Sequence, residues 1–149
     1  MLSLAIGADH RGYEHKMVIQ TGVTLQSTPL EWIDVGTFSP ERTDYPPFAR
    51  LVVDALQTQQ AQLGILICGT GTGMAIAANR FQHIYAGVVW NEMVARRSRE
   101  EDNINVLVIP SDFVTPEESI SLVLAWLHAS FKKGRYQDRI RMIDEWHGL

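Results

Sequence analysis

Five short apolar runs, separated by longer segments of helical periodicity, constrain the fold of this chain more than any other feature. The runs are LSLAIG (2–7), EWIDVG (31–36), LGILIC (63–68), YAGVVW (85–90) and NVLVIP (105–110). Continuous apolar runs of this length are typical of parallel strands that are covered on both faces of a sheet. Their alternation with helical segments predicts a doubly wound α/β domain with right-handed crossover connections.

The segments between the runs have the pattern of crossover helices. We expect these helices over residues 13–26, 47–59, 73–81, 91–101 and 116–131, with a final helix over about 135–146. At the fifth helix, Pro116 suits the first helical position, and Thr115 before it suits the N-cap. No internal repeat or low-complexity linker divides the chain. We therefore expect a single domain over residues 1–149, a Rossmann-like three-layer α/β/α sandwich with a five-stranded parallel sheet.

The composition of the 149 residues narrows the classes of function. A hydrophobic fraction of 46% and a charged fraction of 20% are typical of one globular domain with a buried core. With a formal net charge of −4, the chain has no general basis for nucleic-acid binding, and a small anionic metabolite suits it better than a polymer. We expect no membrane contact, no secretory leader and no bound metal. The single cysteine can form no intramolecular disulfide, and we expect a cytoplasmic protein in which this thiol stays reduced.

In doubly wound folds, ligands bind in the crevice outside the carboxyl ends of the strands. The residues that directly follow each run are therefore the candidates for a functional site. They are Asp9 and His10 after the first run, residues 36–45 after the second, Cys68 to Gly73 after the third, Asn91 and Glu92 after the fourth, and Ser111 and Asp112 after the fifth.

The third run ends on the only cysteine of the chain, Cys68, and continues into the glycine-rich loop GTGTG (69–73). Successive backbone N–H groups of such a loop can converge on an anion, because glycine allows close approach and unusual dihedral angles. Beside a helix N-terminus a thiol can be pushed toward thiolate, with a pKa of about 3.5 to 7.5 in favourable settings. Free cysteine is also among the most buried residue types. From the residues alone, Cys68 is therefore either an inert core residue or a reactive base or nucleophile.

Nucleotide binding is another interpretation of the same glycines. The P-loop pattern fails because no Gly-Lys-Ser/Thr closes the loop, and the dinucleotide pattern G-x-G-x-x-G fails because Met74 occupies its third glycine position. Glu92 lies about twenty residues downstream, near where a ribose-binding acid would be expected. That spacing keeps the nucleotide interpretation open at this point.

The other polar candidates each have an ordinary structural interpretation beside a functional one. Asp9 and His10 suit an N-cap and a solvated histidine as well as a binding site, and the loop before Tyr45 has the composition of a turn. Arg135 and Arg139 lie four residues apart, on one face of the predicted final helix. That spacing suits a clamp on phosphate and also a solvated basic face.

Five segments in a fixed order resemble one known family. They are ADHRGYEHK, DVGTFSPERTDYP, ICGTGTGMAIAANR, SREEDNINVLVI and KKGRYQDRIRMI, and the resemblance runs from Leu4 to about Ile143. The chain resembles the type B ribose-5-phosphate isomerases and galactose-6-phosphate isomerase subunits. The resemblance implies a metal-free, cofactor-free aldose–ketose isomerisation of a sugar phosphate through a cis-enediolate, with ribose 5-phosphate and ribulose 5-phosphate as the leading pair. It also implies a homodimer, or a dimer of dimers, in which the C-terminal segment of one subunit reaches its neighbour's pocket.

The resemblance also implies roles for individual residues. Cys68 would be the base that moves the proton between C1 and C2, Thr70 would assist at the substrate oxygens, and Glu101 occupies the position of a catalytic ring-opening histidine. The N–H groups of residues 69–73 would stabilise the enediolate. The substrate-binding positions implied are Asp9, His10, Tyr45, Gly69, Gly71, Thr72, Gly73, Asp102, Asn103, Arg135 and Arg139.

Three departures from the family pattern bear on the substrate. Glu101 replaces the histidine, and because a glutamate is ionised at neutral pH unless it is buried, it would accept a proton well and donate one poorly. Asp112 stands where many relatives have an arginine that holds phosphate, and Tyr136 replaces a common histidine. A six-carbon substrate such as allose or galactose 6-phosphate, a non-phosphorylated sugar, and a non-catalytic sugar-phosphate-binding module are therefore the alternative hypotheses.

Overall fold

The computed structural model describes residues 1–146 and confirms the doubly wound α/β fold. All five predicted strands form, and they pair in parallel in one sheet. Their order across the sheet is β2 (Leu30–Gly36), β1 (Leu2–Ala8), β3 (Leu63–Cys68), β5 (Val106–Pro110) and β4 (Ala86–Val88). The chain therefore leaves β1 toward one side of the sheet and returns to its other side with β3, which places the topological switch point between these two strands.

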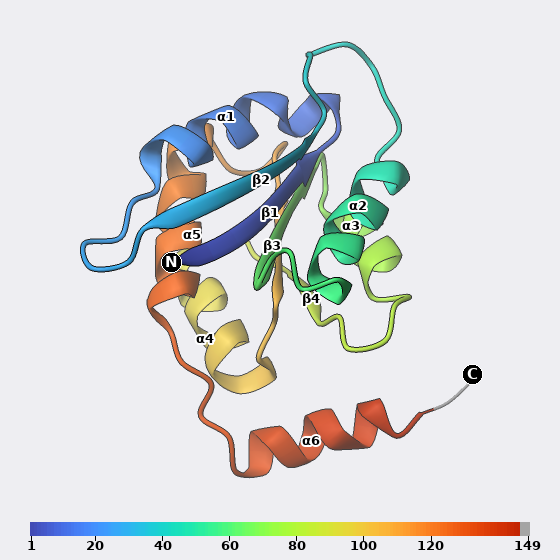
Figure 1. Ribbon diagram of the computed structural model, residues 1–149, viewed down its shortest axis with the longest axis vertical. Coiled ribbons are helices and arrows are strands. Elements are labelled where there is room, and N and C mark those ends of the chain that lie inside the picture. The colour runs from blue at the N-terminus through green and yellow to red at the C-terminus, as the bar shows by residue number, and fades with distance from the viewer. Residues whose placement is uncertain (147–149) are drawn as a thin grey trace.

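Helices cover both faces of the sheet, as the predicted three-layer sandwich requires (Figure 1). On one face lie α1 (Tyr13–Gly22), α4 (Glu92–Asp102) and α5 (Pro116–His128), and on the other lie α2 (Pro46–Gln57) and α3 (Thr72–Ala78). A 3₁₀ turn over His10–Gly12 joins β1 to α1. The last helix, α6 (Arg135–Asp144), lies at the bottom of the view in Figure 1, outside the two layers but in contact with α4. None of the helices within residues 1–146 is long and apolar enough to cross a membrane.

The residues of β1 alternate between two separate clusters of buried side chains. Leu4 and Ile6 are fully buried in the cluster on the α1, α4 and α5 face, which also contains Trp126 of α5. Ala5, between them, packs with Val52 of α2 in the cluster on the other face. Burial of one Leu or Ile side chain contributes about 1.5–3 kcal/mol, so apolar side chains on both faces hold the sheet between its helical layers.

The helix ends agree with the expectation at some positions and differ at others. Thr115 is the N-cap of α5, since its hydroxyl accepts a hydrogen bond of 3.1 Å from the Glu118 N–H. α1 ends at Gly22, four residues earlier than expected, because the TGVT sequence has low helix propensity and Val23 is already extended. α5 ends at His128 rather than at residue 131, and the chain then turns toward α4.

The register between β3 and β5 defines two opposite edges of the sheet. Cys68 pairs with Pro110 at the end where the parallel strands finish, which we call the carboxyl edge. Gly64 pairs with Val106 at the end where they begin, which we call the amino edge. α4 runs from the end of β4 back to the start of β5, so its last turn lies at the amino edge. The following segments stay there, because the backbone N–H of Lys132 donates to the Glu100 carbonyl at 2.9 Å.

Candidate active site

Cys68 is the last residue of β3 and is only 4% exposed. The loop after it bends through Gly71, which has a φ of 77° and is the N-cap of α3. This bend brings the backbone N–H groups of Gly71, Gly73 and Met74 to the side of the sulfur, where they lower the pKa of the thiol. The two interpretations of Cys68 therefore meet in one residue, because the side chain is buried in the core and its sulfur is nevertheless surrounded by polar donors.

The net effect of these surroundings is to raise the pKa of the Cys68 thiol above its ordinary value. Burial is the largest cause, and the negative charge of Asp9 adds to it, whereas the three N–H groups lower the pKa. The direction is opposite to the lowered pKa that the glycine loop suggests. Burial exceeds the effect of the donors because the sulfur is almost completely removed from solvent in the single chain.

Asp9 and His10 lie beside Cys68 at the carboxyl edge. Asp9 is 6% exposed, its N–H donates to the Ile67 carbonyl at 3.2 Å, and its Oδ1 accepts from the Arg11 N–H at 3.0 Å. It is thus an N-cap as well as a neighbour of the thiol. The Nδ1 atom of His10 lies 3.2 Å from both backbone polar atoms of Thr43, which joins the end of β1 to the loop before α2.

Tyr45 and the threonines complete the surroundings of the glycine loop. The Tyr45 ring lies so close to Gly73 that a Cβ added there would be 2.4 Å from Cζ, so only glycine fits under this ring. The exposed hydroxyl of Thr70 accepts a hydrogen bond of 3.2 Å from the Thr72 N–H. Its own O–H can therefore still donate to a ligand oxygen. The carboxyl-edge group consists of the predicted residues Asp9, His10, Tyr45, Cys68, Gly69, Thr70, Gly71, Thr72 and Gly73.

Met74 decides against the nucleotide interpretation of the loop. Its side chain is fully buried among the residues that pack between the sheet and the α2 and α3 layer. In a dinucleotide site, the third glycine would instead allow close contact between helix and strand.

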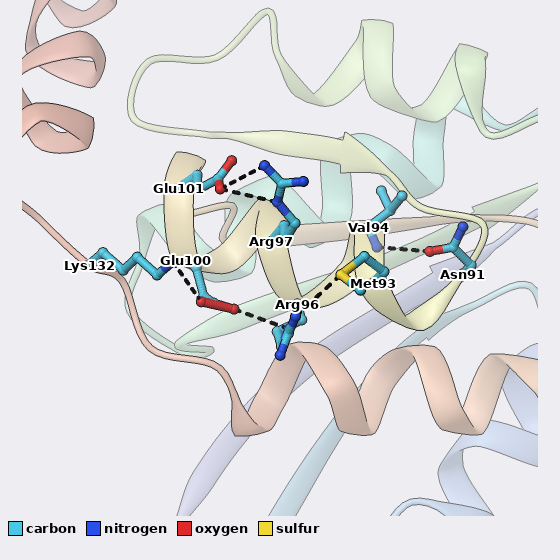
Figure 2. Close-up of polar contacts among 8 residues, drawn as sticks. All are labelled: Asn91, Met93, Val94, Arg96, Arg97, Glu100, Glu101 and Lys132. Atoms are coloured by element: carbon cyan, nitrogen blue, oxygen red, sulfur yellow. Dashed lines mark hydrogen bonds and ion pairs between the residues drawn. The ribbon is translucent and has the colours of Figure 1, made fainter.

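Asn91, which directly follows the fourth run, is the N-cap of α4 and accepts a hydrogen bond of 2.9 Å from the Val94 N–H (Figure 2).

Two residues at the carboxyl edge were not expected to form a pair. Nη1 of Arg11 lies 2.9 Å from Oδ2 of Asp112, so the aspartate that departs from the family pattern has its own cationic partner. Both side chains lie over Gly69, where an added Cβ would be 2.6 Å from Arg11 and 2.8 Å from Asp112. The sequence places these residues 101 positions apart, and only the sheet topology brings them together.

The remaining predicted residues lie at the amino edge and form a second group of Glu101, Asp102, Asn103, Arg135 and Arg139. Glu101 Oε1 accepts hydrogen bonds of 3.1 Å from both Nε and Nη2 of Arg97, one turn earlier on α4 (Figure 2). Asn103 ends α4 in the left-handed conformation, with a φ of 51°. The pKa of Asp102 is raised, first by burial and then by the charge of Glu101, while Arg139 has the opposite effect.

Tyr136 holds the two arginines of α6 close to one aromatic ring. The guanidinium groups of Arg135 and Arg139 lie 5.1 Å and 5.6 Å from its ring centroid. Nη2 of Arg135 also donates to the Tyr136 hydroxyl at 3.2 Å. The residue that replaces a common family histidine therefore brings the predicted phosphate clamp together.

A cavity of about 700 Å³ separates part of α6 from the amino edge. Asp102 and Ile104 line it from one side, and Ile140 and Ile143 of α6 line it from the other. The helix is nevertheless attached to the sheet, since the Tyr85 hydroxyl donates to Asp144 Oδ1 at 2.5 Å. Burial and this bond raise the pKa of Tyr85, so the hydroxyl remains a donor throughout the neutral range.

The structure does not bring the two groups of predicted residues together within one chain. Four residue steps along β3 separate the levels of Gly64 and Cys68, which corresponds to roughly 13 Å, and Glu101 lies beyond the start of the sheet. A single sugar phosphate cannot contact both edges of the same chain. Within residues 1–146, no group of three or more His, Cys, Asp or Glu side chains is arranged to hold a metal ion.

Comparison with known proteins identifies a family that covers nearly the whole chain. The model of the Ribose/Galactose Isomerase family matches residues 4–143. The chain is similar to ribose-5-phosphate isomerase B of Escherichia coli (strain K12), with 41% identity over 145 residues, 96% of this chain and 95% of that protein.

Solved structures show the same similarity. A ribose 5-phosphate isomerase from Thermotoga maritima has a TM-score of 0.91 and 39% identity, with 97% of this chain and 99% of that chain covered. Ribose-5-phosphate isomerase B from Mycoplasma genitalium, solved with bound ribulose-5-phosphate, has a TM-score of 0.87 and 39% identity, with 96% and 94% covered. The resemblance inferred from the five sequence segments is confirmed.

Proposed function

Because the chain belongs to the Ribose/Galactose Isomerase family, we propose that it is an aldose–ketose isomerase that interconverts ribose 5-phosphate and ribulose 5-phosphate. The names of the relatives from Escherichia coli and Thermotoga maritima support this substrate pair, as does the ribulose-5-phosphate bound to the Mycoplasma genitalium protein. The observation that carries the proposal in this chain is the environment of Cys68, a buried residue next to Asp9 and to the backbone N–H groups of the glycine loop.

The proposed reaction needs one proton transfer between C2 and C1, a second between O2 and O1, and a stabilised oxyanion. The Cys68 thiolate removes the proton from C2 of the open-chain aldose, and the electrons of that C–H bond form the C1=C2 bond of a cis-enediolate. The resulting thiol returns a proton to C1, the O2 proton moves to O1, and C2 becomes the carbonyl carbon of the ketose. The Thr70 hydroxyl and N–H groups of the loop are the proposed donors to the enediolate oxygens, and Asp9 accepts hydrogen bonds from the sugar hydroxyls.

The separation of the two groups supports a homodimer in which each active site uses both chains. The carboxyl edge of one copy supplies Cys68, and the amino edge of the second copy supplies Arg135 and Arg139 for the phosphate. Large apolar side chains at Ile76 of α3 and Met142 of α6 are more than half exposed and would be covered by that second copy. A dimer of dimers would be the next larger assembly.

Glu101 and Asp102 are the proposed groups for opening the sugar ring, also from the second copy. Glu101, whose carboxylate lies 3.1 Å from Arg97, is the proposed proton acceptor, and Asp102, whose pKa is raised by burial, is the proposed donor. The proposal places the protein in the cytoplasm, because a catalytic thiol works where thiols are kept reduced.

The ring-opening role can be separated from the proton transfer at carbon. Ribulose 5-phosphate has no furanose ring, so exchange of its C1 hydrogen in D₂O requires Cys68 but no ring opening. We expect Glu101→Gln to keep most of this exchange while it loses turnover of ribose 5-phosphate. Equal loss of both activities would contradict the assignment of Glu101.

The substrate is tested with a coupled assay over a panel of sugars. The panel contains ribose 5-phosphate, allose 6-phosphate, galactose 6-phosphate and unphosphorylated ribose. We expect the highest kcat/KM for ribose 5-phosphate and a much lower value for ribose. Preference for a six-carbon phosphate would replace the substrate pair and keep the reaction. Binding without any turnover would overturn the enzymatic proposal.

A further inference from the structure

The ion pair between Arg11 and Asp112 lies directly against the loop that carries the proposed chemistry. Its members come from opposite sides of β3, since Arg11 follows β1 and Asp112 follows β5. They meet over Gly69, the residue next to Cys68, with 2.9 Å between Nη1 and Oδ2. The pair therefore spans the carboxyl end of the strand on which the proposed base stands.

The backbone around each member of the pair is anchored to the sheet. The N–H of Asp112 donates to the Gly69 carbonyl at 3.0 Å, and the N–H of Arg11 donates to Asp9 at 3.0 Å. The loop after β5 has a further contact with α1, because Nε2 of buried His15 donates to the Val114 carbonyl at 2.7 Å. One contact thus anchors the backbone of Arg11, and two contacts anchor the loop that carries Asp112.

The exposure and chemistry of the pair suit it to a bound anion. The side chains of Arg11 and Asp112 are 56% and 42% exposed, so the guanidinium is open to a ligand. The guanidinium group of arginine has five N–H donors. The contact with Asp112 is made by Nη1, and the other donors of Arg11 can bind phosphoryl oxygens side by side. An unpaired Asp112 would repel a phosphate dianion, whereas the pair presents oriented donors without a net negative charge.

We propose that Arg11, oriented by Asp112, binds the phosphoryl group of the sugar phosphate at the carboxyl edge. Arg11 is then a substrate-binding residue, and Asp112 is a positioning residue that acts through it. The phosphoryl group lies between Arg11 of the chain that supplies Cys68 and the arginines on α6 of the second copy. This inference rests on the proposed isomerase function. It assigns to Arg11 the positive charge that an arginine at position 112 would otherwise supply.

The test compares Arg11→Met with Arg50→Met in kinetic and binding experiments. Arg50 is a matched control, because it forms an exposed ion pair of 3.0 Å with Asp54 on α2. We expect Arg11→Met to raise the KM for ribose 5-phosphate and the inhibition constant of inorganic phosphate by about tenfold or more, with kcat changed far less. Arg11→Lys should recover part of the loss, and Arg50→Met should change neither constant. An Arg11→Met enzyme with both constants within twofold of the wild type would overturn the proposal.

The orienting role of Asp112 has its own readout. We expect Asp112→Asn to raise KM when Arg11 is present and to lower it in an Arg11→Met background, where the unpaired Asp112 carboxylate only repels phosphate. A lower KM in Asp112→Asn when Arg11 is present would show that Asp112 merely repels phosphate, and it would overturn the orienting role.

A binding measurement distinguishes failure of this inference from failure of the proposed function. Calorimetry with ribose 5-phosphate is performed on Cys68→Ala and on Cys68→Ala/Arg11→Met, neither of which needs to turn over substrate. Weaker binding in the double variant supports the anion site even if the wild type shows no isomerase activity. Equal binding, together with normal wild-type turnover, overturns the role of Arg11 and leaves the isomerase function in place.

Discussion

The two edges of the sheet hold their polar groups in different ways. At the carboxyl edge, Cys68 and Asp9 are almost completely buried, and short backbone hydrogen bonds fix them between neighbouring strands. At the amino edge, Glu101 and Arg139 are long side chains on helices, and their contacts are ion pairs and ring contacts near solvent. The first arrangement suits a group whose reactivity depends on a fixed environment, and the second suits recognition of a charged ligand.

This difference accords with the proposal that one chain does not contain a complete site. A buried thiol needs the strand ends and the glycine loop around it, and Arg11, the basic side chain over this loop, is already paired with Asp112. The basic side chains Arg135 and Arg139 stand instead on α6, beyond the opposite edge. In the proposed dimer, the phosphate-binding arginines of one copy would lie next to Cys68 of the other, without long charged side chains in the core.

The largest effect is expected from the carboxyl edge. Cys68→Ala removes the proposed base, and we expect kcat for ribose 5-phosphate to fall about 10³-fold, within the usual range for a general base. Exchange of the C1 hydrogen of ribulose 5-phosphate in D₂O, followed by NMR, should fall equally. The melting temperature is the control, since a small side chain at this buried position should keep the fold. Undiminished exchange would remove Cys68 from the mechanism.

Removal of a cation from the amino edge should affect binding more than chemistry. We expect Arg139→Met to raise KM for ribose 5-phosphate by about 10- to 100-fold, with a smaller change in kcat, because one charge-assisted contact with phosphate is lost. Arg141→Met on the same helix is the matched control, since Arg141 pairs with Asp138 at 3.5 Å and is not a predicted ligand. A similar rise in KM for both variants would indicate a general effect of the charge on α6.

The pH dependence tests the environment at the carboxyl edge. Burial raises the pKa of the Cys68 thiol, and the thiolate is the active base, so the active fraction increases as pH rises toward that pKa. We expect kcat/KM to increase about tenfold per pH unit on the acidic side of this ionisation. A profile that is flat from pH 7 to pH 9 would show that the second copy or the substrate lowers the thiol pKa.

The smallest effect is expected at Tyr136. Tyr136→Leu removes the ring near Arg135 and Arg139, and we expect KM to rise about two- to fivefold. Tyr136→Phe keeps the ring and loses only the hydroxyl that accepts from Arg135, so its KM should lie closer to the wild-type value. If the two variants have the same KM, the ring contributes nothing beyond the hydroxyl.

The sequence was sufficient for the layers of the fold because local patterns determine them. The run at 63–68 coincides with β3, and Thr115 caps α5 as predicted. The run at 85–90 forms only the three-residue strand β4, whose pairing with β5 is limited to Ala86–Val88. The end of α1 at Gly22 also differs from the predicted end at residue 26. The low helix propensity of the residues near Gly22 is a weak signal in the sequence compared with the apolar pattern.

The arrangement of the candidate site depends on contacts that no local pattern contains. The residues at the carboxyl ends of β1 and β3 were expected to lie close together. The structure confirms this for Asp9 and Cys68. The pair of Arg11 and Asp112 depends on the strand order, which the spacing of the runs does not encode. The location of Glu101 at the opposite edge follows from the direction of α4, and it becomes visible only when that helix is placed on the sheet.

The central claim, that two chains complete one active site, can be tested directly by subunit complementation. We expect two variants, Cys68→Ala and Arg135→Met/Arg139→Met, each to be nearly inactive at low substrate concentration. In the experiment, equal amounts of the two variants are mixed, unfolded and refolded together. If the site is shared, half of the dimers are mixed and each mixed dimer has one intact site, so about a quarter of the wild-type activity returns. If each chain contains its own complete site, every site keeps one defect. A mixture no more active than the separate variants would contradict the shared site.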